Sequence, residues 1–155
     1  MRVLLIQAFT ALDMELVYPI GLAYLAAHLD DAEVDIFDIN LYRDRPYEAL
    51  EQKLREFDPQ VVGLSLRNIK VATPGAHADD FAPQQATVKR IRQVLPEVFL
   101  VVGGTAFSLY AEAFMERLPE VDVGVWGEAE HRFPKLLTTR DPSKIPGVYF
   151  RDNGE

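Results

Sequence analysis

The sequence contains no cysteine among its 155 residues. Disulfide bonds, thiolate zinc sites, cysteine nucleophiles and cysteine-ligated iron–sulfur clusters are therefore excluded from this chain. Long apolar runs are also missing, because the apolar start, residues 3–6, is too short to cross a membrane and no signal-peptide cleavage pattern follows it. We therefore expect a cytoplasmic protein with no membrane partner.

Basic residues are scarce relative to acidic ones. The chain has 16 Lys and Arg residues against 24 Asp and Glu residues, its net charge is −8, and its basic residues form no cluster. This balance predicts no nucleic-acid partner, because binding to phosphates needs a basic surface. The length and the hydrophobic content of 48% fit one globular domain with a substantial core.

Short apolar runs alternate with stretches of helical periodicity, a pattern typical of parallel strands joined by crossover helices. The expected strands are residues 2–7, 33–38, 60–66, 98–103 and 121–126. Helices are expected around residues 22–29, 50–57, 88–95 and 111–118, with a last helix that starts near Glu128. The predicted fold class is α/β: a Rossmann-like, flavodoxin-like, doubly wound sheet of five parallel strands in the order 2-1-3-4-5.

The C-terminal residues predict one more extended segment. Residues 145–155 indicate a strand that runs into an Asn-Gly turn without a return strand. We expect residues 1–140 to form the domain and residues 141–155 to begin a linker or strand that leads to a further domain.

The loop after the first strand, residues 8–18, is long enough to bind a ligand but contains no glycine. Dinucleotide-binding and Walker-A loops need glycine there, so both are excluded. A phosphoreceiver domain would need an aspartate at the end of the third strand, where Ser65 and Leu66 stand, so that class is excluded. A flavodoxin is excluded as well, because the acids Asp13 and Glu15 in the loop after the first strand would repel the flavin phosphate. Asp38, at the end of the second strand, is expected to have a structural role.

Two later strands end in glycine. Gly103 and Gly104 precede Thr105, and Gly127 precedes Glu128. Glycine removes side chains at the sheet edge where ligands of this fold bind, so a bulky ligand could lie against the backbone. These residues, together with the end of the third strand, predict a binding site. The sequence indicates no catalytic residue and no metal site made by side chains.

Five motifs in this order resemble the N-terminal cobalamin (vitamin B12)-binding domain of cobalamin-dependent radical SAM enzymes of the methyltransferase type. They are residues 18–26 (YPIGLAYLA), 38–40 (DIN), 61–65 (VVGLS), 101–104 (VVGG) and 127–137 (GEAEHRFPKLL). The match spans nearly the whole chain. The closing residues 145–148 (IPGV) look like the segment by which that family enters its second domain.

The resemblance implies a Rossmann-like domain that holds cobalamin for methyl transfer from SAM, via methylcobalamin, to a substrate. It also implies a C-terminal radical SAM domain in cis, whose cysteines would bind a four-iron four-sulfur cluster and SAM in the parent protein. Because this chain has no cysteine, we expect it to be inactive by itself.

The sequence departs from cobalamin domains of the methionine-synthase type, in which a histidine after the first strand binds cobalt. No histidine lies in that loop here. The resemblance therefore implies base-off cobalamin without a histidine ligand, and Arg67 would fill the lower face without coordinating, because a guanidinium has no lone pair to offer. The nucleotide tail would enter near Ser65 and the paired glycines, with the Ser65 and Thr105 hydroxyls as polar anchors.

The full set of predicted cofactor-binding residues follows from these strand ends and from the loops beside them. It comprises Leu12, Tyr18, Ser65, Leu66, Arg67, Asn68, Gly103, Gly104, Thr105, Gly127 and Glu128. Two alternatives remain open at this point: a non-catalytic small-molecule sensor or interaction domain of flavodoxin-like fold, and a domain of that fold that binds nothing.

Overall fold

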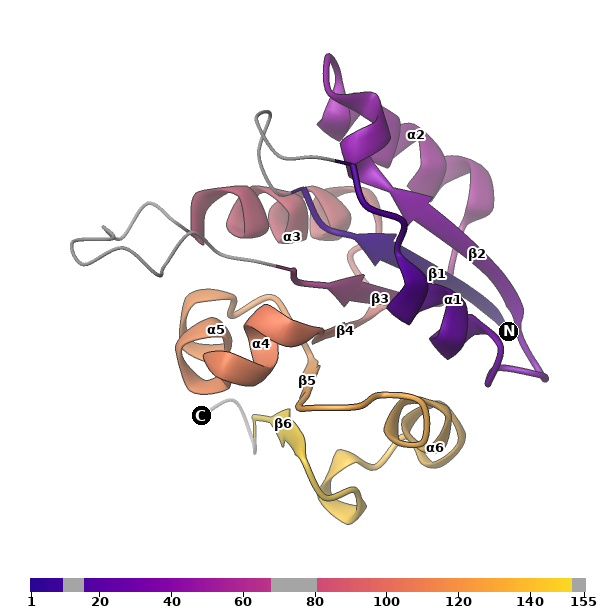
Figure 1. Cartoon of the computed structure of the whole chain (residues 1–155), viewed down its shortest axis with the longest axis vertical. Coiled ribbons are helices and arrows are strands. Elements are labelled where there is room, and N and C mark those ends of the chain that lie inside the picture. The colour runs from indigo at the N-terminus through magenta and orange to yellow at the C-terminus, as the bar shows by residue number, and fades with distance from the viewer. Residues whose placement is uncertain (10–15, 68–80, 152–155) are drawn as a thin grey trace.

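A central β-sheet organises the chain in the computed structural model, which describes residues 1–9, 16–67 and 81–151. The strands are β1 (Arg2–Gln7), β2 (Glu33–Asp38), β3 (Val61–Ser65), β4 (Phe99–Gly103), β5 (Val123–Val125) and β6 (Val148–Phe150). Their order in the sheet is β2-β1-β3-β4-β5-β6 (Figure 1). The predicted fold class and the order of the five parallel strands are confirmed.

The sixth strand is an addition to the predicted sheet. β6 pairs antiparallel with β5, with Val148 opposite Val125 and Phe150 opposite Val123. The strand expected in the tail therefore finds its partner in β5, and the Asn-Gly turn lies outside the described residues. Part of the segment predicted as a linker thus belongs to the edge of this sheet.

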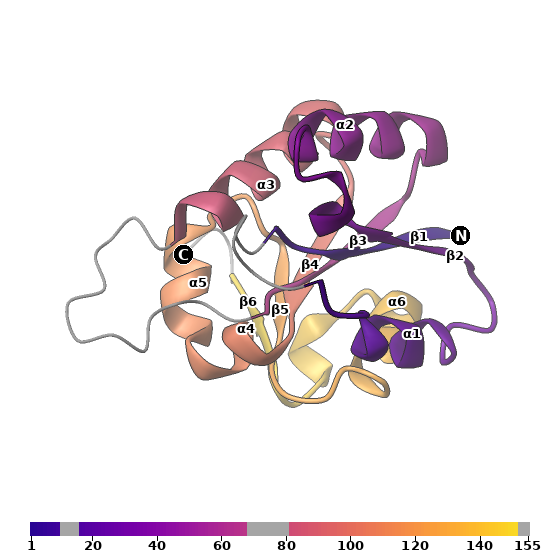
Figure 2. The ribbon, with the colours of Figure 1, turned by 45° about the horizontal axis from the view of Figure 1, so that its top comes forward.

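Helices cover both faces of the sheet, as Figure 2 shows. One face packs against α2 (Pro46–Phe57), α3 (Ala82–Val94), α4 (Thr105–Leu109) and α5 (Ala111–Arg117). The other packs against α1 (Ile20–Ala26) and α6 (Arg132–Thr139). Alternate strand residues serve the two faces: Leu4 and Ile6 face the first group of helices, whereas Val3 and Leu5 face the second.

Several helix boundaries differ from the prediction: α1 ends at Ala26 rather than at residue 29, and α2 and α3 begin at Pro46 and Ala82, earlier than expected. α6 begins at Arg132 rather than near Glu128, because Gly127 has a positive φ of 71° and the chain after it stays irregular up to His131. A short additional helix, α4, precedes the predicted one. Tyr110, with φ −137° and ψ 38°, interrupts the helical backbone between α4 and α5.

The parallel register aligns the carboxyl ends of the central strands. Gln7 of β1 lies opposite both Asp38 of β2 and Ser65 of β3, and Ser65 lies opposite Gly103 of β4. The polar and glycine residues predicted from separate parts of the sequence therefore form one row. This row borders the edge at which ligands bind in doubly wound sheets.

Gly124 makes room for the helix that follows β4. The fully buried Phe107 ring of α4 packs on β5, and a Cβ on Gly124 would lie 2.1 Å from its Cζ atom. Since real contacts of this kind are longer than 3 Å, no side chain fits there without displacing Phe107. The absence of a side chain at Gly124 therefore sets the position of α4 against the sheet.

We expect Gly124→Val to destabilise the domain by about 1–3 kcal/mol, because the added methyl groups overpack the Phe107 site. The free energy of unfolding, measured by urea denaturation, checks this. Gly21→Ala is the matched control, because a Cβ on Gly21 meets no atom within 4 Å. Equal destabilisation of the two variants would contradict the role of Gly124.

Candidate functional site

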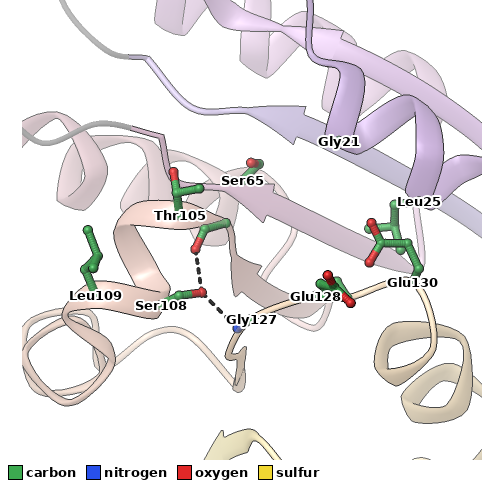
Figure 3. Close-up of a pocket in the computed structure, with 11 residues that line it drawn as sticks. Gly21, Leu25, Ser65, Thr105, Ser108, Leu109, Gly127, Glu128 and Glu130 are labelled. Atoms are coloured by element: carbon green, nitrogen blue, oxygen red, sulfur yellow. Dashed lines mark hydrogen bonds between the residues drawn. The ribbon is translucent and has the colours of Figure 1, made fainter.

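A cavity of about 600 Å³ opens at the carboxyl edge of the sheet (Figure 3). Its walls come from the end of β3, from both ends of α1, from α4 and from the loop between β5 and α6. The lining residues are Gly21, Leu25, Ser65, Gly104, Thr105, Ser108, Leu109, Gly127, Glu128, Ala129 and Glu130. The volume falls within the range of small-molecule sites, roughly 300–1,000 Å³.

The turn from β4 into α4 lies directly on the backbone that follows β3. Gly104 has φ 97°, and a Cβ there would lie 2.7 Å from the Leu66 carbonyl oxygen. Two backbone hydrogen bonds hold this contact: the Leu66 N–H donates to the Gly103 carbonyl at 2.8 Å, and the Ala106 N–H donates to the Leu66 carbonyl at 3.0 Å. Only glycine satisfies both the left-handed backbone and the close approach.

A narrow slot of about 50 Å³ continues from the cavity into the domain. It runs between β3 and β4 on one side and α1 and α6 on the other, and shares Leu25, Ser65, Gly104 and Ala129 with the cavity. Its other lining residues are Leu22, Gly63, Leu64, Val101, Val102, Gly103, Val125 and Phe133. The slot is therefore apolar, with the Ser65 hydroxyl at its junction with the wider cavity.

Hydrogen bonds fix the loop that forms the wall opposite β3. The Ser108 hydroxyl donates to the Gly104 carbonyl at 3.0 Å and accepts from the Gly127 N–H at 2.8 Å (Figure 3). The Arg132 guanidinium donates to the carbonyls of Glu128, at 2.6 Å, and Pro146, at 2.8 Å. The wall is therefore braced from α4 on one side and from α6 on the other.

Asp38 has the structural role expected from the sequence. Its carboxylate accepts from the Asn40 N–H at 2.9 Å, the Asn40 side-chain amide at 2.7 Å and the Gln7 side-chain amide at 3.0 Å. Gln7 also donates to the Val17 carbonyl at 3.2 Å. These contacts tie the end of β1 to the short helical turn after β2 and to the segment that enters α1.

The structure brings many of the predicted site residues together. Those that line the cavity are Ser65, Gly104, Thr105, Gly127 and Glu128, and Gly103 lines the slot.

The remaining predicted residues lie elsewhere. Leu66 is fully buried in the core, and Arg67 follows it as a half-buried residue outside both cavity walls. Tyr18 is 72% exposed and lines a separate cavity of about 430 Å³ beside Asp38. Leu12 and Asn68 lie outside the described residues.

Sequence reasoning did not select six lining residues: Gly21, Leu25, Ser108, Leu109, Ala129 and Glu130. Ser108 and Leu109 follow Thr105 by about one helical turn, so a helix placed directly after Gly104 would have identified them. Gly21 and Leu25 stand on α1, whose position over the ends of β3 and β4 comes only from the tertiary structure.

Among the described residues, no group of three or more side chains could hold a metal ion, and no helix is long and apolar enough to span a membrane.

Comparison with known proteins identifies the family of this site. Residues 14–137 match the family model of the B12 binding domain. An uncharacterized methyltransferase of Pyrococcus horikoshii is 32% identical over 143 residues, which cover 88% of this chain and 28% of the relative. The cobalamin-dependent radical SAM methyltransferase TokK of Streptomyces tokunonensis is 35% identical over 81 residues, 49% of this chain and 12% of that protein.

A solved structure shows the same arrangement of the chain. The radical S-adenosylmethionine methyltransferase TsrM from Kitasatospora setae, with cobalamin and a [4Fe-4S] cluster bound, superposes with a TM-score of 0.85 and 25% identity. The match covers 97% of this chain and 29% of TsrM, so the chain spans less than a third of the relatives it matches. The resemblance found in the sequence motifs is confirmed: the chain belongs to the B12 binding domain family, and its relatives include cobalamin-dependent radical SAM methyltransferases.

Proposed function

We propose that this chain is the cobalamin-holding part of a radical SAM methyltransferase and that it binds the cofactor base-off, without a histidine ligand. The observation that carries the proposal is the cavity at the carboxyl edge with its apolar slot, formed where Gly104 lies against Leu66. The family membership and the likeness to TsrM support the same conclusion.

The cavity has room for the polar part of the nucleotide tail of cobalamin, and the lining of the slot suits the benzimidazole at the end of the tail. At about 50 Å³ the slot would have to widen between the sheet and helices α1 and α6 to admit that ring system. The slot is lined by aliphatic residues, glycines and Phe133, surroundings that suit the flat, apolar benzimidazole. The wider cavity offers the hydroxyls of Ser65, Thr105 and Ser108 to the polar groups of the tail. The carboxylates of Glu128 and Glu130, drawn in Figure 3, can accept hydrogen bonds from hydroxyl or amide groups of the ligand.

When bound, cobalamin would supply a cobalt atom that accepts a methyl group from SAM and passes it to the substrate. The residues of this chain hold the nucleotide tail and orient the cofactor at the sheet edge. SAM and the four-iron four-sulfur cluster would be bound by a further domain in cis, since this chain has no cysteine. The chain therefore binds and positions the cofactor, and turnover depends on the remainder of the parent protein.

Two histidines in the described part of the chain lie apart from the cavity. The His28 and His131 rings contact each other edge to face, with centroids 5.9 Å apart, and His28 Nδ1 lies 2.8 Å from the Tyr24 carbonyl oxygen. Neither residue lines the cavity or the slot. For these two histidines the placement supports cofactor binding without histidine ligation, and His77 lies outside the described residues.

The purified chain should retain hydroxocobalamin after desalting, with the absorbance spectrum of the base-off form, because the slot would sequester the benzimidazole. In electron paramagnetic resonance, the reduced Co(II) form should show no nitrogen splitting on cobalt. Nitrogen splitting would contradict the absence of a nitrogen ligand. A folded, colourless protein fraction would contradict cobalamin binding and favour the sensor or interaction domain.

Gly21→Phe should lower cobalamin affinity at least about tenfold, because Gly21 lines the cavity, a Cβ there meets no atom within 4 Å, and the ring would take up space in the cavity. Gly21→Ala is the control, since it keeps the cavity open. A glycine within a helix lowers stability by roughly 0.5–1 kcal/mol relative to alanine. Because both substitutions remove such a glycine, neither should reduce the free energy of unfolding. Titration with hydroxocobalamin measures the affinities, and equal values for the two variants would contradict the location of the site.

Gly104→Leu is a less informative test of the same site. A Cβ at Gly104 presses on the Leu66 backbone, so that substitution alters the turn itself as well as the cavity.

Arg67 follows β3 at the same sheet edge, where its positive charge would favour the reduced, less positive states of cobalt. We expect Arg67→Gln to make the Co(II)/Co(I) potential of the bound cofactor more negative by roughly tens of millivolts, and Arg67→Lys, which keeps the charge, to change it little. Spectroelectrochemical titration measures the potentials. The same potential in all three proteins would show that Arg67 does not act on the cobalt.

A further inference from the structure

Ser108 connects two walls of the cavity through four hydrogen bonds, of which one is its backbone N–H donating to the Gly104 carbonyl at 3.0 Å. Its hydroxyl donates to the Gly104 carbonyl and accepts from the Gly127 N–H, at 3.0 and 2.8 Å, and both bonds are drawn in Figure 3. Its carbonyl accepts from the Trp126 indole N–H at 2.9 Å. One residue of α4 therefore holds the glycine that follows β4 and the glycine that follows β5.

The sheet alone does not set the distance between these two glycines. β5 has three residues, and its pairing with β4 consists of Val101 opposite Val123 and Val102 opposite Gly124. The pairing of the two strands ends there, and Gly104 and Gly127 both have left-handed backbone, with φ of 97° and 71°. Ser108 links these two glycines by hydrogen bonds, and all three residues line the cavity.

We propose that Ser108 is a positioning residue for the nucleotide tail of the cofactor, an inference that rests on the proposed function. In the free domain, water can replace a lost hydroxyl at Gly127, which is exposed. A ligand in the cavity excludes that water, and the Gly127 N–H then needs the Ser108 hydroxyl as its partner, whereas the Gly104 carbonyl keeps the Ser108 N–H at 3.0 Å. The hydroxyl therefore matters more to the bound state than to the folding of the free domain.

The test compares cobalamin with cobinamide, the corrinoid that lacks the nucleotide tail. We expect Ser108→Ala to weaken cobalamin binding about tenfold, since the Gly127 N–H is left without a partner in the bound state. Cobinamide binding and the thermal midpoint of the free domain should stay unchanged. Ser108→Thr should restore cobalamin affinity, because its hydroxyl can still reach the carbonyl one turn earlier.

Thr138→Ala is the matched control. The Thr138 hydroxyl makes the same kind of bond within a helix, to the Pro134 carbonyl at 3.0 Å, but it does not line the cavity. Wild-type protein that fails to bind cobalamin would overturn the proposed function itself. If wild-type protein binds cobalamin, two results would overturn the role of Ser108 and leave the proposed function standing. Either the cobalamin affinity of Ser108→Ala equals that of the wild type, or Ser108→Ala loses affinity for cobalamin and for cobinamide to the same extent.

Discussion

The close contact between Gly104 and Leu66 is the constraint on which the site depends. Because Gly104 has no side chain, the turn after β4 lies on the backbone after β3, and two hydrogen bonds fix it there. α4 starts from this turn, so the contact determines where Thr105 and Ser108 stand at the cavity. Any side chain at Gly104 would move the turn away from β3 and displace that wall.

A second contact fixes the same helix at its middle residue. Phe107 enters the core on Gly124 of β5, where only a residue without a side chain leaves enough space. The wall of the cavity is thus held by one glycine after β4 and another within β5. Both contacts form between segments that are distant in the sequence, and for this reason the site is a product of packing rather than of one local motif.

The two faces of the sheet have different roles. The face under α2, α3, α4 and α5 forms the larger hydrophobic cluster, which gives the domain most of its core. On the other face, α1 and α6 leave the narrow slot between them and the ends of β3 and β4.

Asp38 shows how hydrogen bonds organise the edge of the sheet. Its carboxylate accepts from Asn40 and Gln7, so this strand-end acid stabilises the loops beside the site.

The sequence by itself determined the fold class, the order of the parallel strands and the family, because apolar runs, helical periodicity and strand-end glycines are local signals. It also indicated Ser65, Gly104, Thr105, Gly127 and Glu128, which follow strand ends that any parallel sheet brings to one edge. Only the tertiary structure decided that Leu66 belongs to the core and that Gly21, Leu25 and Ser108 line the cavity. Those positions depend on how α1 and α4 pack against the sheet, and packing between distant segments leaves no local pattern in the sequence.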